Sequence, residues 1–400
     1  MTEKRLDAVI AGHICLDMFP EFHDKEMTSF KELFVPGKLI NVRGMKISTG
    51  GPVSNTGIAM HVLGARVSLI AKIGDDFIGE AILNFLQKRI SVEGIKINKG
   101  ESSSYTVVIA PKNLDRIFLH NPGTNDTFCY DDIDFDLVKR AGLFHLGYPP
   151  LMKRMYQDGG EQLEKIFRKV SELGVITSLD FALPDPEEPS GKVDWNGILK
   201  RVLPYVNIFL PSIEEVLFML DREKFLSLRE KAKGKELLQY FISNDLTRVS
   251  NILVDYGANI VGLKCGSRGF YIQTTHKEKM KKMVGINLDN WAQRQLWAPT
   301  YRVDKFASAA GAGDSAIAGF LVAFLKGESI EMCLKYACMC GAQNVQALDT
   351  VSGIKSWEET SREIKSEWPQ NEIKIEESGW VYDHEQKIWQ GPEDKNQLNR

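Results

Sequence analysis

The sequence predicts an α/β protein built on a central, mainly parallel sheet with helices on its faces. Apolar runs of strand length alternate with helical patterns along most of the chain, and turn residues separate them. This alternation favours right-handed βαβ units, whose strands run parallel. The composition agrees, because 43% hydrophobic and 26% charged residues are ordinary for a folded chain of 400 residues.

The first expected element is a strand over Leu6–Gly12, rich in β-branched residues and ended by a glycine. A helix begins at Ser54 and stops at Gly64. A buried strand over Val67–Ile73 and a helix over Ile78–Leu86 follow. These elements form the first βαβ unit.

Strand and helix then recur, in the order strand Leu143–Leu146, helix 161–173, strand Val175–Phe181, helix 196–203 and strand Val206–Leu210. Residues Phe270–Thr274 are a further strand, and an apolar helix runs to about Leu325. We expect one large domain over residues 1–355.

Two segments are expected additions to this domain. A stretch at about 221–250 is dense in charge and is interpreted as an exposed helical insert. Residues 356–400 form a C-terminal extension that contains Trp368, Trp380 and Trp389. Disordered tails seldom hold so many large aromatic residues, so we expect the extension to pack on the body, with residues 380–389 as a small hairpin.

Charge and hydropathy exclude several classes of partner. The chain has 50 Lys and Arg against 53 Asp and Glu, a net charge of −3, which argues against nucleic acid or an anionic membrane as partner. No stretch approaches the roughly 18 apolar residues of a membrane span. The first residues lack an apolar signal region, so a cytoplasmic location is expected.

The sharpest local motif is Gly311-Ala-Gly-Asp314, which opens the apolar helix. Glycines ahead of a helix let backbone N–H groups converge, and the helix N-terminus adds a positive field that suits a phosphate. Asp314 in the same turn can accept a proton from an attacking hydroxyl. The alternative is that Asp314 only favours the helix dipole.

A second cluster consists of Gly50, Gly51 and Asn55, with Asp17 just beyond the first strand. Carboxylate and amide groups on loops suit the hydroxyls of a polyol, and the glycine pair permits close backbone approach. Ordinary turn chemistry is the alternative. The Walker and Gly-x-Gly-x-x-Gly motifs are absent, and histidines such as His13 lack zinc spacing and are interpreted as structural.

Taken in order, these motifs resemble the ribokinase-like (PfkB) family of carbohydrate kinases. The matching segments are Gly50–Asn55 with Val67–Glu80, Asn121–Asp126, Asn207–Glu215, Val261–Gly269 and Gly311–Phe320. The resemblance implies a three-layer ribokinase-like fold. It also implies a small β lid from about 14–46 and 96–122, whose apolar strands pair between two subunits in a homodimer.

The resemblance also implies roles for individual residues. Asp314 becomes the general base, and the backbone of Gly311, Ala312 and Gly313 becomes an anion hole. The acceptor is held by Asp17, Gly50, Gly51 and Asn55. The nucleotide and its metal are held by Lys264, Gly266, Ser212 and, acting on Mg²⁺, Glu215.

The expected activity is therefore the transfer of phosphate from ATP, with Mg²⁺, to a hydroxymethyl group of a sugar, sugar acid or related polyol. A nucleoside kinase and a non-catalytic ligand-binding or regulatory protein remain the alternatives. Two departures from the family pattern, Ser212 and Ser308, motivate the non-catalytic alternative, and a third, Pro52-Val53, makes ribose an unfavoured acceptor. Because Ser308 replaces an aspartate that helps relatives bind K⁺, we expect little activation by K⁺.

Overall fold

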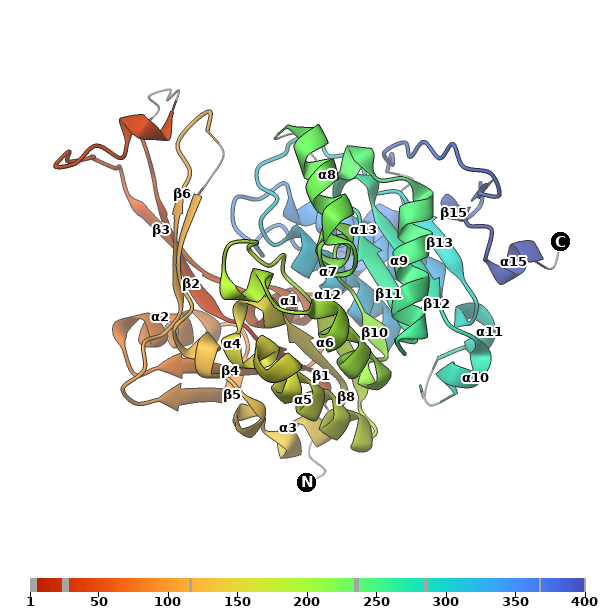
Figure 1. Ribbon diagram of the computed structural model, residues 1–400, viewed down its shortest axis with the longest axis horizontal. Coiled ribbons are helices and arrows are strands. Elements are labelled where there is room, and N and C mark those ends of the chain that lie inside the picture. Colours follow the sequence, from red (N-terminus) through yellow and green to blue (C-terminus); the bar gives the residue numbers. More distant parts are fainter. Residues whose placement is uncertain are drawn as a thin grey trace.

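The computed structural model describes residues 6–23, 29–114, 117–233, 237–281, 283, 286–366 and 368–398. A layered α/β body carries a small sheet that projects from one end (Figure 1). The α/β prediction is confirmed. Parts of the predicted lid (24–28 and 115–116) and of the predicted insert (234–236) lie outside the described residues.

The described part of the large sheet has eleven strands. They are β1 (Leu6–Gly12), β4 (Val67–Gly74), β5 (Ser91–Asn98), β8 (Ala141–Gly147), β9 (Ile176–Asp180), β10 (Ile208–Phe209), β11 (Ile260–Lys264), β12 (Phe270–Thr274), β13 (Gln295–Ala298), β14 (Val381–Asp383) and β15 (Ile388–Gln390). Their spatial order is β14-β15-β13-β12-β11-β10-β9-β8-β1-β4-β5.

Strand direction divides this sheet into two parts. From β11 to β5 all neighbours pair in parallel. Beyond β11, the strands β12, β13, β15 and β14 pair antiparallel. The carboxyl ends of the parallel strands therefore share one edge, where ligands bind in open α/β sheets.

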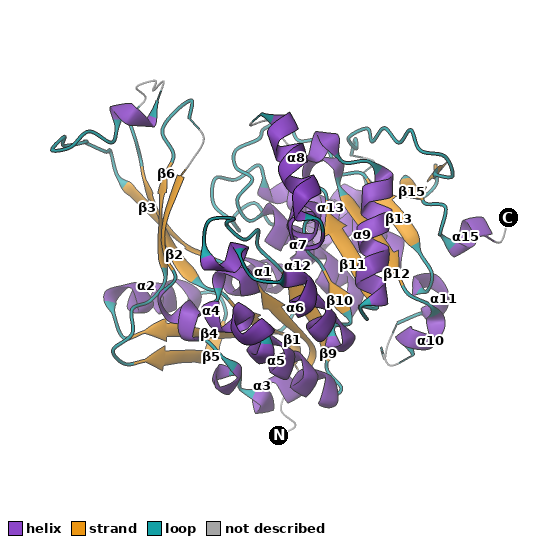
Figure 2. Ribbon diagram, viewed as in Figure 1, coloured by secondary structure: helices purple, strands orange, loops and turns teal. Residues whose placement is uncertain are grey.

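Helices cover both faces of the sheet (Figure 2). One face carries α1 (Pro52–Val62), α2 (Phe77–Leu86), α10 (Lys277–Met280), α11 (Leu288–Trp291), α12 (Ala312–Leu325), α13 (Ile330–Asn344) and α14 (Trp357–Lys365). The other carries α3 (Phe135–Lys139), α4 (Lys153–Tyr156), α5 (Glu161–Glu172), α6 (Trp195–Val202), α7 (Ile213–Leu220), α8 (Arg222–Ala232) and α9 (Ser243–Asp255).

The large sheet has a hydrophobic core on each face, because side chains alternate between the two faces along every strand. In β1, Ala8 and Ile10 face the core under α1 and α12, whereas Val9 and Ala11 face the core under α5 and α6. All four side chains are fully buried, because neighbouring Cβ atoms point to opposite faces of a sheet that is covered on both sides.

The small sheet has the order β3-β2-β6-β7. Its strands are β2 (Cys15–Pro20), β3 (Met45–Gly50), β6 (Tyr105–Ile109) and β7 (Ile117–Asn121). The strands β2 and β6 pair in parallel, and each pairs antiparallel with its outer neighbour. This sheet leaves apolar side chains in solvent, since Met45 and Ile47 are each half exposed.

The C-terminal segment adds a hairpin to the large sheet. The strands β14 and β15 pair with each other, and β15 pairs with β13, so the hairpin predicted over residues 380–389 is confirmed. A short helix, α15 (Lys395–Leu398), follows. Across the part of the chain that the structure describes, every helix is too short or too polar to span a bilayer.

Candidate functional site

Polar side chains gather where the parallel strands end. His13 follows β1, Tyr148 follows β8, Asp180 ends β9, Ser212 follows β10 and Lys264 ends β11. Because these strands are neighbours in the sheet, the five residues line one edge. The N-terminus of α12 reaches the same edge, since Asp314 contacts Tyr148.

Asp314 lies in the first turn of α12, behind Gly311, whose φ of 75° is the left-handed conformation that favours glycine. The carboxylate is 1% exposed. Oδ2 accepts from Asn55 Nδ2 at 2.8 Å, and the Tyr148 hydroxyl lies 3.1 Å from Oδ1 and 3.2 Å from Oδ2. Burial raises the pKa of Asp314, and the hydrogen bonds with Asn55 and Tyr148 and the positive charge of Lys264 oppose part of that rise.

Asn55 connects Asp314 to a distant loop. Its side-chain Oδ1 accepts from Thr350 Oγ1 at 2.7 Å, while Nδ2 donates to Asp314. Both bonds together fix the orientation of the carboxamide, since the oxygen must face a donor and the nitrogen an acceptor. Asn55 therefore holds the Asp314 carboxylate in one position.

Lys264 supplies the positive charge of the site. Its ammonium lies 2.5 Å from Asp180 Oδ1, and the two side chains are 12% and 0% exposed. A Cβ at Gly313 would lie 3.7 Å from Lys264 Nζ, so the ammonium borders the backbone at the start of α12. Burial lowers the pKa of Lys264, but the carboxylates of Asp180 and Glu215 outweigh it and keep the side chain charged.

Glu215 and Ser212 form the start of α7. Ser212 Oγ accepts from Glu215 N at 3.2 Å, and Glu215 Oε2 accepts from Ser212 N at 2.7 Å, a reciprocal cap of the helix. Burial raises the pKa of Glu215, while Lys264 and the bonds to Ser212 lower it. Ser212, which stands where the family pattern has an asparagine, thus has a defined structural role.

Asp17 and the two glycines occupy the base of the small sheet. Asp17 pairs with Ser48 across β2 and β3, and a Cβ at Gly50 would lie 2.1 Å from Asp17 Oδ2. Gly51 has a φ of 84°, and a Cβ there would lie 2.6 Å from His13 O. The glycine pair is required because side chains at these positions would collide with the strand end and with the carboxylate.

The structure assembles only part of the predicted set in direct contact. Asn55 and Asp314 touch, and Lys264 borders Gly313. Asp17 instead accepts from the Cys15 thiol at 3.2 Å, and burial raises its pKa. No cluster of three or more His, Cys, Asp or Glu suited to a metal ion occurs within the described ranges.

Sequence reasoning missed two residues of the site, Tyr148 and Asp180. Tyr148 has a φ of 64°, which is uncommon for a bulky residue, and it follows a predicted strand. Asp180 lies at the end of another predicted strand, and its Oδ2 is buried with no hydrogen-bond partner among the described residues. Examining the residues within two positions of the end of each predicted parallel strand would have found both.

His13 also lines this edge. It is 3% exposed, burial lowers its pKa to about 3, and its ring centre lies 6.1 Å from that of Tyr148. The ring is therefore neutral near pH 7. Neither ring nitrogen has a hydrogen-bond partner among the described residues.

A cavity of about 510 Å³ begins at the N-terminus of α12. Lys264, Ala312 and Gly313 line it together with Gly266 and Gly269, which flank the turn between β11 and β12. Much of the remaining wall is apolar, with side chains such as those of Tyr301 and Phe306. An anion at the helix N-terminus and an apolar ring system can occupy this cavity together.

Comparison with known proteins gives a consistent result. Residues 26–357 match the family model described as pfkB family carbohydrate kinase. An uncharacterized sugar kinase of Archaeoglobus fulgidus is 25% identical over 73% of this chain and 96% of its own length. A probable fructokinase-5 of Arabidopsis thaliana is 26% identical over 79% of this chain and 90% of its own.

Solved structures share the fold. The ribokinase of Arabidopsis thaliana, complexed with ribose and ATP, aligns with a TM-score of 0.68 over 90% of this chain and 99% of its own, at 17% identity. A putative ribokinase II of E. coli in complex with ATP and Mg²⁺ aligns with a TM-score of 0.65 over 90% and 99%, at 18% identity.

Proposed function

This chain belongs to the pfkB family of carbohydrate kinases, and we propose that it transfers the γ-phosphoryl group of ATP to a hydroxymethyl group of a sugar, sugar acid or related polyol. One observation carries the proposal. A buried carboxylate, Asp314, is held by Asn55 and Tyr148 at a helix N-terminus that Lys264 borders.

Each of these groups has a defined task in phosphoryl transfer. Asp314 accepts the proton of the acceptor hydroxyl while that oxygen forms its bond to the γ-phosphorus. The bond from phosphorus to the bridging oxygen of ATP breaks, and ADP leaves with that electron pair. The backbone N–H groups of Gly311, Ala312 and Gly313 and the ammonium of Lys264 stabilise the charge on the transferred group.

Mg²⁺ fits the oxygen donors beside Lys264. Glu215 provides a carboxylate, and the buried Oδ2 of Asp180 has no other partner among the described residues. These two residues would hold the ion directly or through its water, since Mg²⁺ keeps much of its hydration. When bound, the ion neutralises charge on the phosphates of the nucleotide.

We assign acceptor binding to Asp17, Gly50, Gly51 and Asn55. Asp17 is partly buried and faces Gly50, which leaves room beside the carboxylate for a hydroxyl rather than a side chain. Asn55 belongs both to the acceptor-binding residues and to the residues that hold the base, because it contacts Asp314 directly. The sugar hydroxyls and the reacting hydroxyl are then bound by one connected set of residues.

A screen of ADP release with MgATP over sugars, sugar acids and nucleosides tests this function. We expect at least one sugar-like compound to stimulate release. A response to nucleosides alone would instead identify a nucleoside kinase. No response to any compound, with ligand binding intact, would favour a binding or regulatory protein.

The pH profile gives an independent check of the base. Asp314 must be deprotonated to accept a proton, and burial raises its pKa above the ordinary value of 3.8. We therefore expect turnover to fall on acidification at a higher pH than an exposed aspartate would give.

A further inference from the structure

One wall of the 510 Å³ cavity comes from outside the part of the chain that matches the family model. The match ends at residue 357, whereas Asn371 of the C-terminal extension lines the cavity. Asn371 faces the β11–β12 turn, because its Nδ2 donates to Ser267 O at 3.1 Å. Among the residues that line the cavity it is the single carboxamide.

The position of Asn371 is fixed by the body. Its backbone N donates to Thr300 O at 2.8 Å, and the neighbouring Gln370 forms an antiparallel bridge with Tyr301. On one side Trp368 Nε1 donates to a backbone carbonyl at 2.8 Å, and on the other Ile373 is buried in the core. The side chain is therefore presented to the cavity by backbone that is held on both sides.

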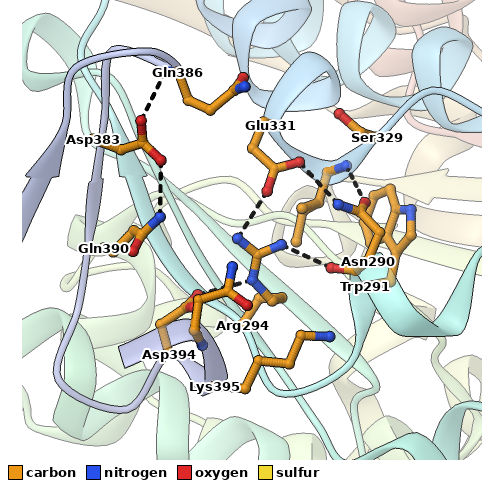
Figure 3. Close-up of polar contacts among 12 residues, drawn as sticks. Asn290, Trp291, Arg294, Ser329, Glu331, Asp383, Gln386, Gln390, Asp394 and Lys395 are labelled. Atoms are coloured by element: carbon orange, nitrogen blue, oxygen red, sulfur yellow. Dashed lines mark hydrogen bonds and ion pairs between the residues drawn. The ribbon is translucent and has the colours of Figure 1, made fainter. Parts of the chain in front are cut away.

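A buried ion cluster holds the rest of the extension. Arg294 lies between Glu331 and Asp394, at 2.8 Å and 2.9 Å (Figure 3). Asp394 also accepts from the backbone N of Gln295, in β13. Because Asp394 is fully buried, the chain beyond Asn371 returns to the sheet and is fixed there.

The bond to Ser267 also decides what Asn371 offers a ligand. It requires the amide nitrogen to face Ser267 O, which distinguishes Nδ2 from Oδ1. One Nδ2 hydrogen is used, so Oδ1 and the second hydrogen remain for a ligand in the cavity. The exocyclic amino group of adenine can donate to Oδ1, whereas guanine has a carbonyl oxygen at that position.

We propose that Asn371 selects the nucleobase, accepting a hydrogen bond from the adenine amino group and favouring ATP over GTP. The proposal rests on the proposed kinase function, because it requires a nucleotide whose phosphates lie at Gly313 and Lys264. It makes the C-terminal extension part of the nucleotide site.

Calorimetric titration of the full chain with MgADP and MgGDP, without sugar, tests the proposal. Truncation in Asn371→Ala removes one hydrogen bond, so we expect about 3- to 10-fold weaker ADP binding and little change for GDP. Glu372→Ala, a change at the exposed neighbouring residue, serves as the control and leaves both affinities unchanged.

Thermal unfolding of each variant shows that it is folded. Unchanged ADP binding in Asn371→Ala, or an equal loss of ADP and GDP binding, would overturn the role of Asn371 alone. Failure of the unmodified chain to bind ADP would contradict the ATP-dependent function itself.

Discussion

The buried pair of Lys264 and Asp180 gives the most quantitative prediction. Lys264→Met leaves the Asp180 carboxylate, which is 0% exposed, without its cation. Removing one partner of a buried pair costs about 3–5 kcal/mol of the free energy of unfolding, because the remaining charge stays desolvated. The same change removes the ammonium beside Gly313 and so lowers turnover.

Urea denaturation of Lys264→Met and of the double variant with Asp180→Asn separates these two effects. The double variant should regain part of the lost stability, since the carboxylate paired directly with Lys264 is gone, but it should not regain turnover. Lys277→Met is the control, because Lys277 and its partner Asp289 are 50% and 82% exposed, and it should cost less than about 1 kcal/mol. A loss below 1 kcal/mol in Lys264→Met, or recovery of turnover in the double variant, would refute the reasoning.

Four further predictions concern the metal, the monovalent cation, the small sheet and the buried ion cluster around Arg294. Glu215→Gln should raise the Mg²⁺ concentration needed for half-maximal activity without changing acceptor affinity, and an unaltered Mg²⁺ titration would count against its role. Because Ser308 replaces a carboxylate, K⁺ should activate little over Tris at matched ionic strength, and several-fold K⁺-selective activation would contradict this. The half-exposed apolar strand at Ile47 predicts a homodimer through the lid, which a single 45.1 kDa species in sedimentation at micromolar concentration would disprove. Asp394→Asn should lower the free energy of unfolding by about 3 kcal/mol, because Arg294 loses a buried carboxylate, and an unchanged urea midpoint would argue against a stabilising role of the ion cluster.

Elements of the parallel core could be predicted because their sequences carry strong local signals. The predicted strand Leu6–Gly12 has the same bounds as β1, and Val67–Ile73 differs from β4 by one residue. The edge strand β5 and the short strand β13 were not predicted. Gly94 and charged residues interrupt the first, and the second has only four residues and is defined by its neighbours in the sheet.

The residues of the site also divide into those with a local sequence signal and those that only the fold brings together. Asp314 belongs to a local motif, so its glycines and helix identify it within the sequence. Tyr148 lies 166 residues from its partner Asp314, and Asp180 lies 84 residues from Lys264. Such pairs arise only when the order of the strands brings their carboxyl ends together, and a single sequence does not give that order.

The most direct test of the central claim compares Asp314→Asn with the unmodified chain on the sugar that the screen identifies. The amide keeps the size of the side chain but cannot accept the proton, so turnover should fall at least about 10²-fold while calorimetric sugar binding persists. Asp304→Asn, at an exposed residue ten positions earlier, should retain full turnover. Near-normal turnover in Asp314→Asn, with the fold and sugar binding intact, would contradict the assignment of Asp314 as the base.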